Sequence, residues 1–251
     1  MKNKIVISVV ICLFLSLSGY CPLAQGDLHQ KVDKKGRVYW HGVTTARKIA
    51  LTFDDGPSKD TLQILQELKK YNVKATFFVI GKNVEKYPEI FTRIINDGHA
   101  IGNHSYSHPD MFMEEPVMIR KQIRNTEEAV RKYCGQELFL FRPPYGIENA
   151  WVFKEAGKHG YTIIKWSVSG FDWESKKAGT IAKRIIGNVR NGSIIILHDG
   201  RRLKQRNSCQ PTIDALSKII IALEARGYHF VTVPDLLGIT GKNADAMDNL
   251  M

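Results

Sequence analysis

The sequence predicts a single α/β domain, a distorted seven-stranded (β/α) barrel, and three observations support this prediction. Seven apolar runs alternate with helix-like segments between residues 47 and 240. Such alternation is typical of a parallel sheet covered by helices. Seven strands come close to the eight of the common α/β barrel. A chain of 251 residues also suits one large domain. An open doubly wound sheet is the alternative architecture.

The predicted strands are short apolar runs at residues 48–53, 74–81, 99–104, 137–143, 161–168, 193–199 and 228–233. Leu62, Leu65 and Leu68 share one face of the first predicted helix, which Ser58 can cap. Further helices are expected over 83–97, 115–133, 148–158 and 179–190, and from Pro211 to Arg226.

The two ends of the chain differ from this domain. Lys2 and Lys4 precede an apolar run over residues 5–17, which is shorter than the roughly 20 residues of a membrane span. Residues 1–25 are therefore predicted to be a signal peptide, with an uncleaved anchor as the alternative. Residues 26–46 form a polar lead-in segment, the domain covers 47–240, and 241–251 form a flexible tail.

The charge of the chain indicates where it works. The formal net charge is +11 at pH 7. A basic exported protein suits an anionic cell-wall or envelope surface, so we expect a secreted or envelope location and no stable membrane span after signal cleavage. Nucleic acid is not expected as a partner, because the sequence has no zinc finger, RNP motif or basic helix. We expect a monomer.

Two further features concern the loop after the sixth predicted strand. Four cations in residues 200–206 are predicted to aid binding of an anionic polymer, with an ordinary solvated loop as the alternative. Cys209 is expected at the carboxyl ends of the strands and Cys134 at their amino ends, about 20 Å away. Because a disulfide tolerates Cα atoms at most about 7 Å apart, we expect both to be thiols, with Cys209 reacting faster.

Polar residues follow five of the predicted strands. Asp54 and Asp55 follow the first, His104 and His108 the third, Arg142 the fourth, Asp172 and Trp173 the fifth, and His198 ends the sixth. In a parallel barrel these strand ends converge on the face that carries active sites. The sequence therefore predicts that acids, bases and a cation meet at one rim.

The spacing of His104 and His108 is compatible with a metal site. Two histidines four residues apart can lie on one face of a helical turn and bind one ion. A carboxylate from another strand end would complete a set of two histidines and one carboxylate. One residue of the Asp54–Asp55 pair could then bind metal while the other acts as a base. Two solvated loop histidines are the alternative.

Together these residues form five sequence blocks, "TFDDGP", "HSYSH", "RPPYG", "SGFDW" and "ILHD", in that order. The chain resembles the NodB-homology polysaccharide deacetylases, carbohydrate esterase family 4, from about Lys48 to Leu237. The resemblance implies a metal-dependent hydrolase that removes N-acetyl groups from the amino sugars of a chitin-like polysaccharide or peptidoglycan.

The resemblance also implies roles for individual residues. Asp54 is the catalytic base, which Arg142 holds and tunes. Asp55, His104 and His108 hold the metal, Zn²⁺ or another divalent ion such as Co²⁺. Tyr145 offers its backbone N–H to the oxyanion, and Asp172 orients the catalytic acid, His198. Trp173, Tyr145 and an aliphatic residue of the last block, assigned to Leu197, line the acetyl pocket.

Two positions depart from the family pattern: Ser169 stands where Asp is usual, and Ile196 where Leu is usual. Two alternatives to this function stay open. An O-deacetylase of acetylated xylan needs much the same groups. A non-catalytic carbohydrate-binding protein on the same fold would be favoured by a missing base, ligand or acid, and none is missing.

Overall fold

The structure is a computed structural model, and it describes residues 38–200 and 208–241. The predicted signal peptide, most of the lead-in segment, the cations of the basic loop and almost all of the tail lie outside the described residues. Nothing in the structure therefore tests these four expectations.

The described residues contain one curled sheet whose ladders are all parallel. The strand order is β1-β6-β5-β4-β3-β2-β8-β7, and β9 also pairs with β2. The strands are β1 (Val38–Tyr39), β2 (Lys48–Asp54), β3 (Thr76–Val79), β4 (Ala100–Asn103), β5 (Leu140–Phe141), β6 (Thr162–Ile164), β7 (Val168–Ser169), β8 (Ile194–His198) and β9 (His229–Val231).

The two ends of this strand path approach each other, so the sheet curls into a distorted barrel. The chain leaving β6 donates from Lys165 N–H to the carbonyl of Tyr39 in β1, and two residues later Ser167 N–H donates to Ile194 in β8. His41 forms an isolated antiparallel bridge with Ser193, just before β8. The segments 39–41 and 165–167 therefore link the β6 end of the sheet to β8.

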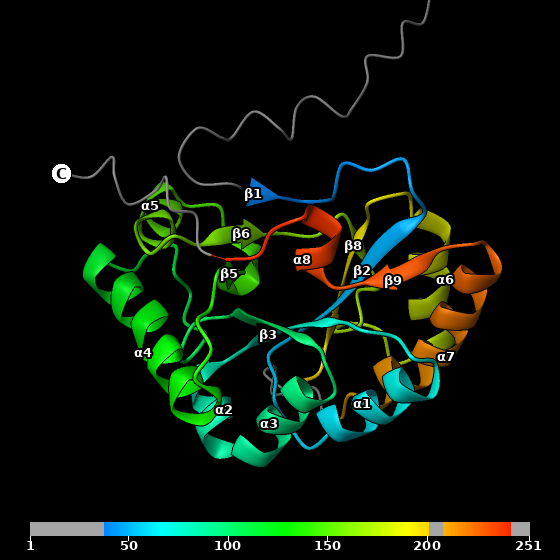
Figure 1. Cartoon of the computed structure of the whole chain (residues 1–251), viewed down its shortest axis with the longest axis horizontal. Coiled ribbons are helices and arrows are strands. Elements are labelled where there is room, and N and C mark those ends of the chain that lie inside the picture. Colours follow the sequence, from blue (N-terminus) through cyan, green and yellow to red (C-terminus); the bar gives the residue numbers. More distant parts are fainter. Residues whose placement is uncertain (1–37, 201–207, 242–251) are drawn as a thin grey trace, which may run out of the picture.

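Helices cover the outside of the curled sheet. Figure 1 shows α4, α2, α3, α1, α7 and α6 in an arc around it, with α5 near β1. The helices are α1 (Thr61–Lys70), α2 (Gly81–Lys86), α3 (Pro88–Asn96), α4 (Pro116–Cys134), α5 (Ala150–Lys158), α6 (Ala178–Asn188), α7 (Gln210–Ala225) and α8 (Val233–Leu237), with a 3₁₀ turn, η1, at Pro144–Gly146.

The alternation of side chains along the strands produces two apolar cores. Ile49, Leu51 and Phe53 of β2 belong to a large cluster with the outer helices. Ala50 belongs to a second cluster inside the curl, which Val233 and Leu236 of α8 also join. Further along the same inner face of β2 come Thr52 and Asp54. The inner face is therefore apolar near the amino ends of the strands and polar near their carboxyl ends.

The predicted barrel and all seven predicted strands are confirmed, with three corrections. β1 adds Val38 and Tyr39, which were assigned to the lead-in segment, to the sheet beside β6. The fifth predicted strand divides into β6 and β7, which pair with different neighbours. The predicted helix over 83–97 is two helices. Tyr87 is the C-cap of α2, and Pro88 begins α3 directly after it.

Cys134 and Cys209 are both free thiols, as predicted. The predicted order of reactivity is contradicted by burial. Cys209 is completely buried at the start of α7, whereas Cys134 is half-buried at the end of α4. A buried thiol reacts slowly, so Cys134 is the more accessible of the two. Within the described ranges, no helix combines the length and the apolar character that crossing a membrane requires.

Candidate active site

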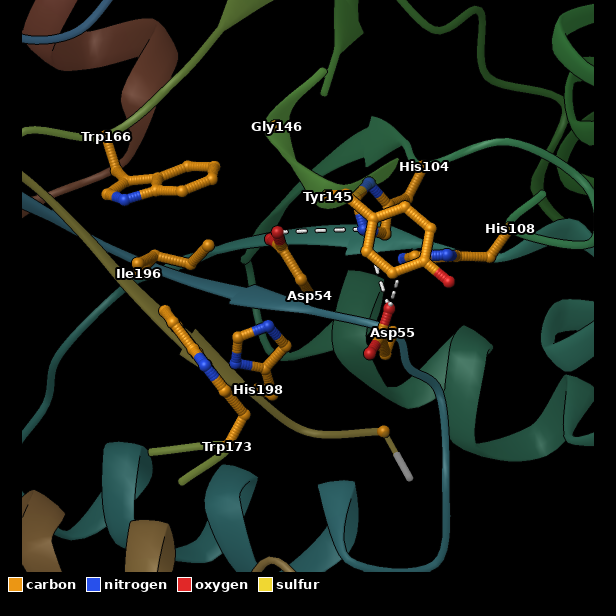
Figure 2. A pocket seen from close by; sticks show the side chains of 11 residues that line it. Asp54, Asp55, His104, His108, Tyr145, Gly146, Trp166, Trp173, Ile196 and His198 are labelled. Atoms are coloured by element: carbon orange, nitrogen blue, oxygen red, sulfur yellow. Dashed lines mark ion pairs between the residues drawn. The ribbon is translucent and has the colours of Figure 1, made fainter. Parts of the chain in front are cut away.

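The polar residues at the strand ends surround one cavity of about 360 Å³. Figure 2 shows the lining side chains, which come from the carboxyl ends of six strands and the segments that follow them. Of the predicted site residues, the cavity is lined by Asp54, Asp55, His104, His108, Tyr145, Trp173 and His198. Arg142 and Asp172 lie behind this lining, and both are buried. The predicted convergence at one rim is confirmed.

Asp54 and Asp55 face the same cavity because the strand ends between them. Neighbouring residues of a strand point to opposite faces, so a continued strand would separate the two side chains. Asp55 instead has a left-handed φ of 75°, which Asp tolerates better than most residues. Asn83 Nδ2 donates to the Asp55 carbonyl at 2.7 Å and helps to hold this turn. The two carboxylates can therefore have different partners.

Asp54 is paired with a buried arginine. Arg142 Nη1 lies 2.6 Å from Asp54 Oδ1 and 2.8 Å from Thr52 Oγ1. The other donors of this guanidinium bind the carbonyls of Ile164 and Lys165 at 3.0 and 2.9 Å. Burial lowers the pKa of Arg142, and the Asp54 carboxylate opposes that shift. Because arginine stays charged in proteins, Asp54 faces a fixed cation.

Asp55 is surrounded by histidines. Its Oδ1 lies 3.1 Å from His108 Nε2 and 3.5 Å from His104 Nε2. Candidate ligand atoms of these three buried residues all lie within 4.8 Å of one another. His104 Nδ1 donates to the Arg142 carbonyl at 2.7 Å, so Nε2 carries the lone pair that a metal requires. The donor set and the fixed tautomer fit a divalent metal ion.

The loop that carries the two histidines is held from two sides. Ser105 N–H donates to Asn103 Oδ1, and Ser105 Oγ accepts from His108 N–H, both at 2.9 Å. Gln122 of α4 accepts from the backbone N–H groups of Tyr106 and Ser107 at 3.0 and 2.8 Å. These bonds hold the backbone of the loop that carries the two imidazoles.

His198 is bonded to Asp172 twice. Its Nδ1 lies 2.8 Å from Asp172 Oδ1, and its backbone N–H donates to Oδ2 at 2.9 Å. Thr212 Oγ1 donates to the same Oδ2 at 2.8 Å. Burial lowers the pKa of His198, but Asp172, with smaller contributions from Asp55 and Asp54, raises it from 6.5 to about 9. A divalent cation bound beside it would lower this value again.

The predicted role of Leu197 as a wall residue is wrong. Leu197 is completely buried in the outer core, and a Cβ at Gly170 would lie 3.3 Å from its Cδ2. Ile196 lines the cavity instead. The cause is alternation along β8: Asp54 pairs with His198 in register, and residues two apart share a face. Trp173 packs its ring edge on His198, with 5.3 Å between the ring centroids.

The cavity also has lining residues that the sequence analysis did not select, namely Gly146, Trp166 and Gly200. A Cβ on Gly200 would lie 2.1 Å from the Asp55 carbonyl, so glycine permits the close approach of these two segments. Trp166 follows β6 and stands opposite the metal-binding side of the cavity (Figure 2). Its position at the carboxyl end of a predicted strand was the signal that could have identified it.

Tyr145 lies in the short turn η1 and is 58% exposed. Its ring meets the ring of His108 edge to face, with 4.8 Å between centroids. Its φ of 57° is left-handed, an uncommon conformation for a bulky residue. The turn therefore brings both the backbone and the ring of Tyr145 to the edge of the metal-binding side.

Asp199 follows His198, but its carboxylate binds a residue at the start of α1 behind the site. Thr61 Oγ1 donates to Asp199 Oδ2 at 2.6 Å, and the Asp199 N–H donates to the Asp54 carbonyl at 3.0 Å. Burial, with Asp55 and Asp54 nearby, raises the pKa of Asp199 to about 7. These contacts join the start of α1 to the ends of β2 and β8.

Comparison with known proteins agrees with this geometry. The polysaccharide deacetylase family model matches residues 41–164. A peptidoglycan-N-acetylglucosamine deacetylase of Bacillus cereus is 43% identical over 192 residues, which are 75% of this chain and 68% of that protein. The family-model match spans the first three of the five sequence blocks, and the relative matches three quarters of the chain.

Two solved structures share the fold. The Bc1960 peptidoglycan N-acetylglucosamine deacetylase is 39% identical with a TM-score of 0.78, over 83% of this chain and 96% of that one. BA3943 of Bacillus anthracis, described as a CE4 family pseudoenzyme, is 27% identical with a TM-score of 0.74, over 81% and 70% of the two chains. The sequence blocks, the site and these similarities show that the chain belongs to the NodB-homology polysaccharide deacetylases, carbohydrate esterase family 4.

Proposed function

We propose that this chain removes acetyl groups from N-acetylglucosamine residues of peptidoglycan, outside the cytoplasmic membrane. The observation that carries the catalytic part is the different surroundings of the two aspartates: Asp54 faces Arg142, and Asp55 faces His104 and His108. The similar peptidoglycan deacetylase of Bacillus cereus and the net charge of +11 favour an anionic wall polymer as substrate.

Asp55, His104 and His108 would hold a divalent metal ion, for which we propose Zn²⁺. Two imidazoles and one carboxylate are a ligand set of catalytic zinc sites that leaves a position open. When bound, such an ion polarises the acetyl carbonyl and makes water more acidic. The Arg142 carbonyl keeps the proton of His104 on Nδ1, away from the ion.

Asp54 is the proposed general base. Its carboxylate is buried and lies 2.6 Å from the Arg142 guanidinium, which fixes its orientation in the cavity. Oδ1 is occupied by Arg142, which leaves Oδ2, on the side of His104, to accept the proton of the attacking water. Attack on the acetyl carbon converts the amide into a tetrahedral oxyanion, and the Tyr145 N–H is the proposed donor to this oxyanion.

His198 is the proposed general acid. The leaving amine of an amide needs a proton, and a protonated imidazole bonded to Asp172 can give it. Breaking the C–N bond then yields acetate and a free amino sugar. Ile196 and Trp173 form the apolar wall next to His198, where the acetyl methyl group would lie.

The fold alone does not establish activity, because the pseudoenzyme BA3943 shares it. The experiment is acetate release from peptidoglycan, N-acetylated chitin oligomers and acetylated xylan, measured before and after chelation and after adding Zn²⁺ or Co²⁺. We expect chelation to abolish release and added metal to restore it, with peptidoglycan the best substrate. Full activity of metal-free protein, or release from xylan esters alone, would contradict the proposal.

A further inference from the structure

Lys165 is a buried cation that none of the steps above uses. It is 5% exposed and follows β6, immediately before Trp166. Its Nζ donates to the carbonyl of Gly146 and lies 3.2 Å from Glu148 Oε1. Burial lowers the pKa of Lys165, and Glu148 opposes that shift. A lysine is rarely buried without a specific partner, so the bond to Gly146 is the feature to explain.

Gly146 ends the turn that carries Tyr145, and this turn is strained. Tyr145 has φ 57° and ψ 9°, and Gly146 has φ 64°. A bulky residue keeps a left-handed conformation only when its surroundings hold it there. Within the turn, Gly146 N–H donates to the Pro143 carbonyl at 3.0 Å. From outside, Trp166 packs so closely that a Cβ on Gly146 would lie 2.5 Å from its ring.

Lys165 is connected to both halves of the site. Its own carbonyl accepts from Arg142 Nη2 at 2.9 Å, and Arg142 in turn holds Asp54. Its side chain binds the turn of Tyr145 at the Gly146 carbonyl. One residue therefore links the cation behind the proposed base to the turn that carries the proposed oxyanion donor.

We propose that Lys165 is a positioning residue that fixes the Pro144–Gly146 turn, and with it the backbone N–H of Tyr145, relative to Asp54. The inference rests on the proposed function, in which this N–H faces the oxyanion. Loss of the Nζ bond removes a restraint on the Gly146 peptide and lets the strained turn relax. The donor then no longer stands where the charge develops, although substrate and metal still bind.

The test replaces Lys165 by Met, which keeps most of the aliphatic stem but removes the Nζ donor, which lies 6.0 and 5.6 Å from the ring centroids of Trp40 and Trp166. Complete removal of an oxyanion donor lowers kcat by about 10²–10³-fold, so we expect displacement of one to lower kcat about 10–100-fold. KM for N-acetylated oligomers should change less than about threefold. The affinity for a methylphosphonamidate analogue of the tetrahedral state should weaken by about the same factor as kcat/KM.

Three variants serve as comparisons. Lys154→Met removes an exposed lysine that also lies over a tryptophan, 5.1 Å from the Trp151 centroid, and should leave kcat unchanged. Glu148→Gln keeps the Nζ bond to Gly146, so its kcat should fall by less than about threefold. Lys165→Arg keeps the buried cation, so its kcat should fall less than that of Lys165→Met. If the Met variant does not fold, Lys165→Gln is measured in its place by the same comparison.

Zinc content and circular dichroism are measured on every variant, and rates refer to folded, metal-loaded protein. A kcat of Lys165→Met within twofold of wild type would overturn the inference, as would a lower kcat with unchanged affinity for the analogue. Either result leaves the proposed function standing as long as the wild-type protein releases acetate. Absence of acetate release from the wild type would instead overturn the function itself.

Discussion

The unequal roles of the two adjacent aspartates can be tested with Asp54→Asn. Asp54 is 2% exposed, and its Oδ1 accepts from Arg142 at 2.6 Å. An amide has the same shape, and its oxygen can still accept from Arg142. It carries no charge, however, and it cannot take a proton from water. The substitution therefore removes the base while leaving Asp55, His104 and His108 in place.

The expected magnitudes follow from these contacts. Loss of a general base lowers turnover about 10²–10⁴-fold. At 1.36 kcal/mol per factor of ten this corresponds to about 3–5 kcal/mol of transition-state stabilisation. Breaking a buried ion pair costs about 3–5 kcal/mol of folding stability, and the amide oxygen should keep the loss near the lower value. A chain of this size then loses roughly 6–12 °C in Tm.

The assay measures acetate release in excess Zn²⁺, bound metal by elemental analysis, and Tm. Asp54→Asn should bind one equivalent of metal and turn over slowly. Asp55→Asn should bind metal at least about 10–100-fold more weakly, the loss seen when only an outer partner of a ligand is removed. Asp214→Asn, which changes an exposed aspartate of α7, is the control for charge. Equal metal loss in both site variants, with turnover following occupancy, would refute the assignment of base and ligand.

Three other outcomes are expected. In Gly56→Ala the new Cβ would lie 2.0 Å from a carboxylate oxygen of Asp199, so the loop after the base must move. We expect the free energy of unfolding in denaturant to fall by about 1–3 kcal/mol and kcat to fall strongly. Asp172→Asn removes the carboxylate that raises the pKa of the proposed acid to about 9, so the alkaline limb of the kcat/KM–pH profile should move to lower pH while the acidic limb stays. Native alkylation followed by non-reducing mass spectrometry should find no Cys134–Cys209 peptide and should label Cys134 first; earlier labelling of Cys209 would contradict its burial.

The parts of the site that the sequence predicted are those fixed by strand order. Asp54 and His198 pair in register, and both end strands of a parallel sheet, so their meeting follows from topology. The same register indicates which residue forms the pocket wall. Residues two apart in a strand share a face, and Ile196 precedes His198 by two. Assigning Leu197 ignored that alternation.

Other features depend on contacts between segments far apart in the sequence. Val38 and Tyr39 form a strand of two residues, too short for any periodicity, and pair with β6 more than 100 residues later. Lys165 interrupts an apolar run and would be expected to point to solvent. It is instead buried, and its partners are Gly146 and Glu148 from the segment after β5. Local patterns carry no signal for such pairings.

Backbone conformation is the part of the site that the sequence could least indicate. Among the described residues, the non-glycine positions with positive φ are Asp55, Asn72, Ser105, His108, Tyr145 and Phe171. All of these except Asn72 lie in segments that follow strands at the carboxyl edge, and three of them line the cavity. Glycine is the usual signal of a left-handed residue, and although Asp and His adopt this conformation more often than most residues, Ser105, Tyr145 and Phe171 carry no such signal.

These conformations explain why the site needs so many supporting bonds. A left-handed residue other than glycine persists only where other contacts hold it. Asn83 holds the turn at Asp55, Asn103 and Gln122 hold the loop with His108, and Lys165 holds the turn with Tyr145. The residues that bind to backbone around the cavity are therefore as specific to its geometry as the side chains that line it. We accordingly expect substitutions of these supporting residues to lower kcat strongly and Tm only slightly. Substitutions in the outer core should instead lower Tm strongly and kcat only slightly.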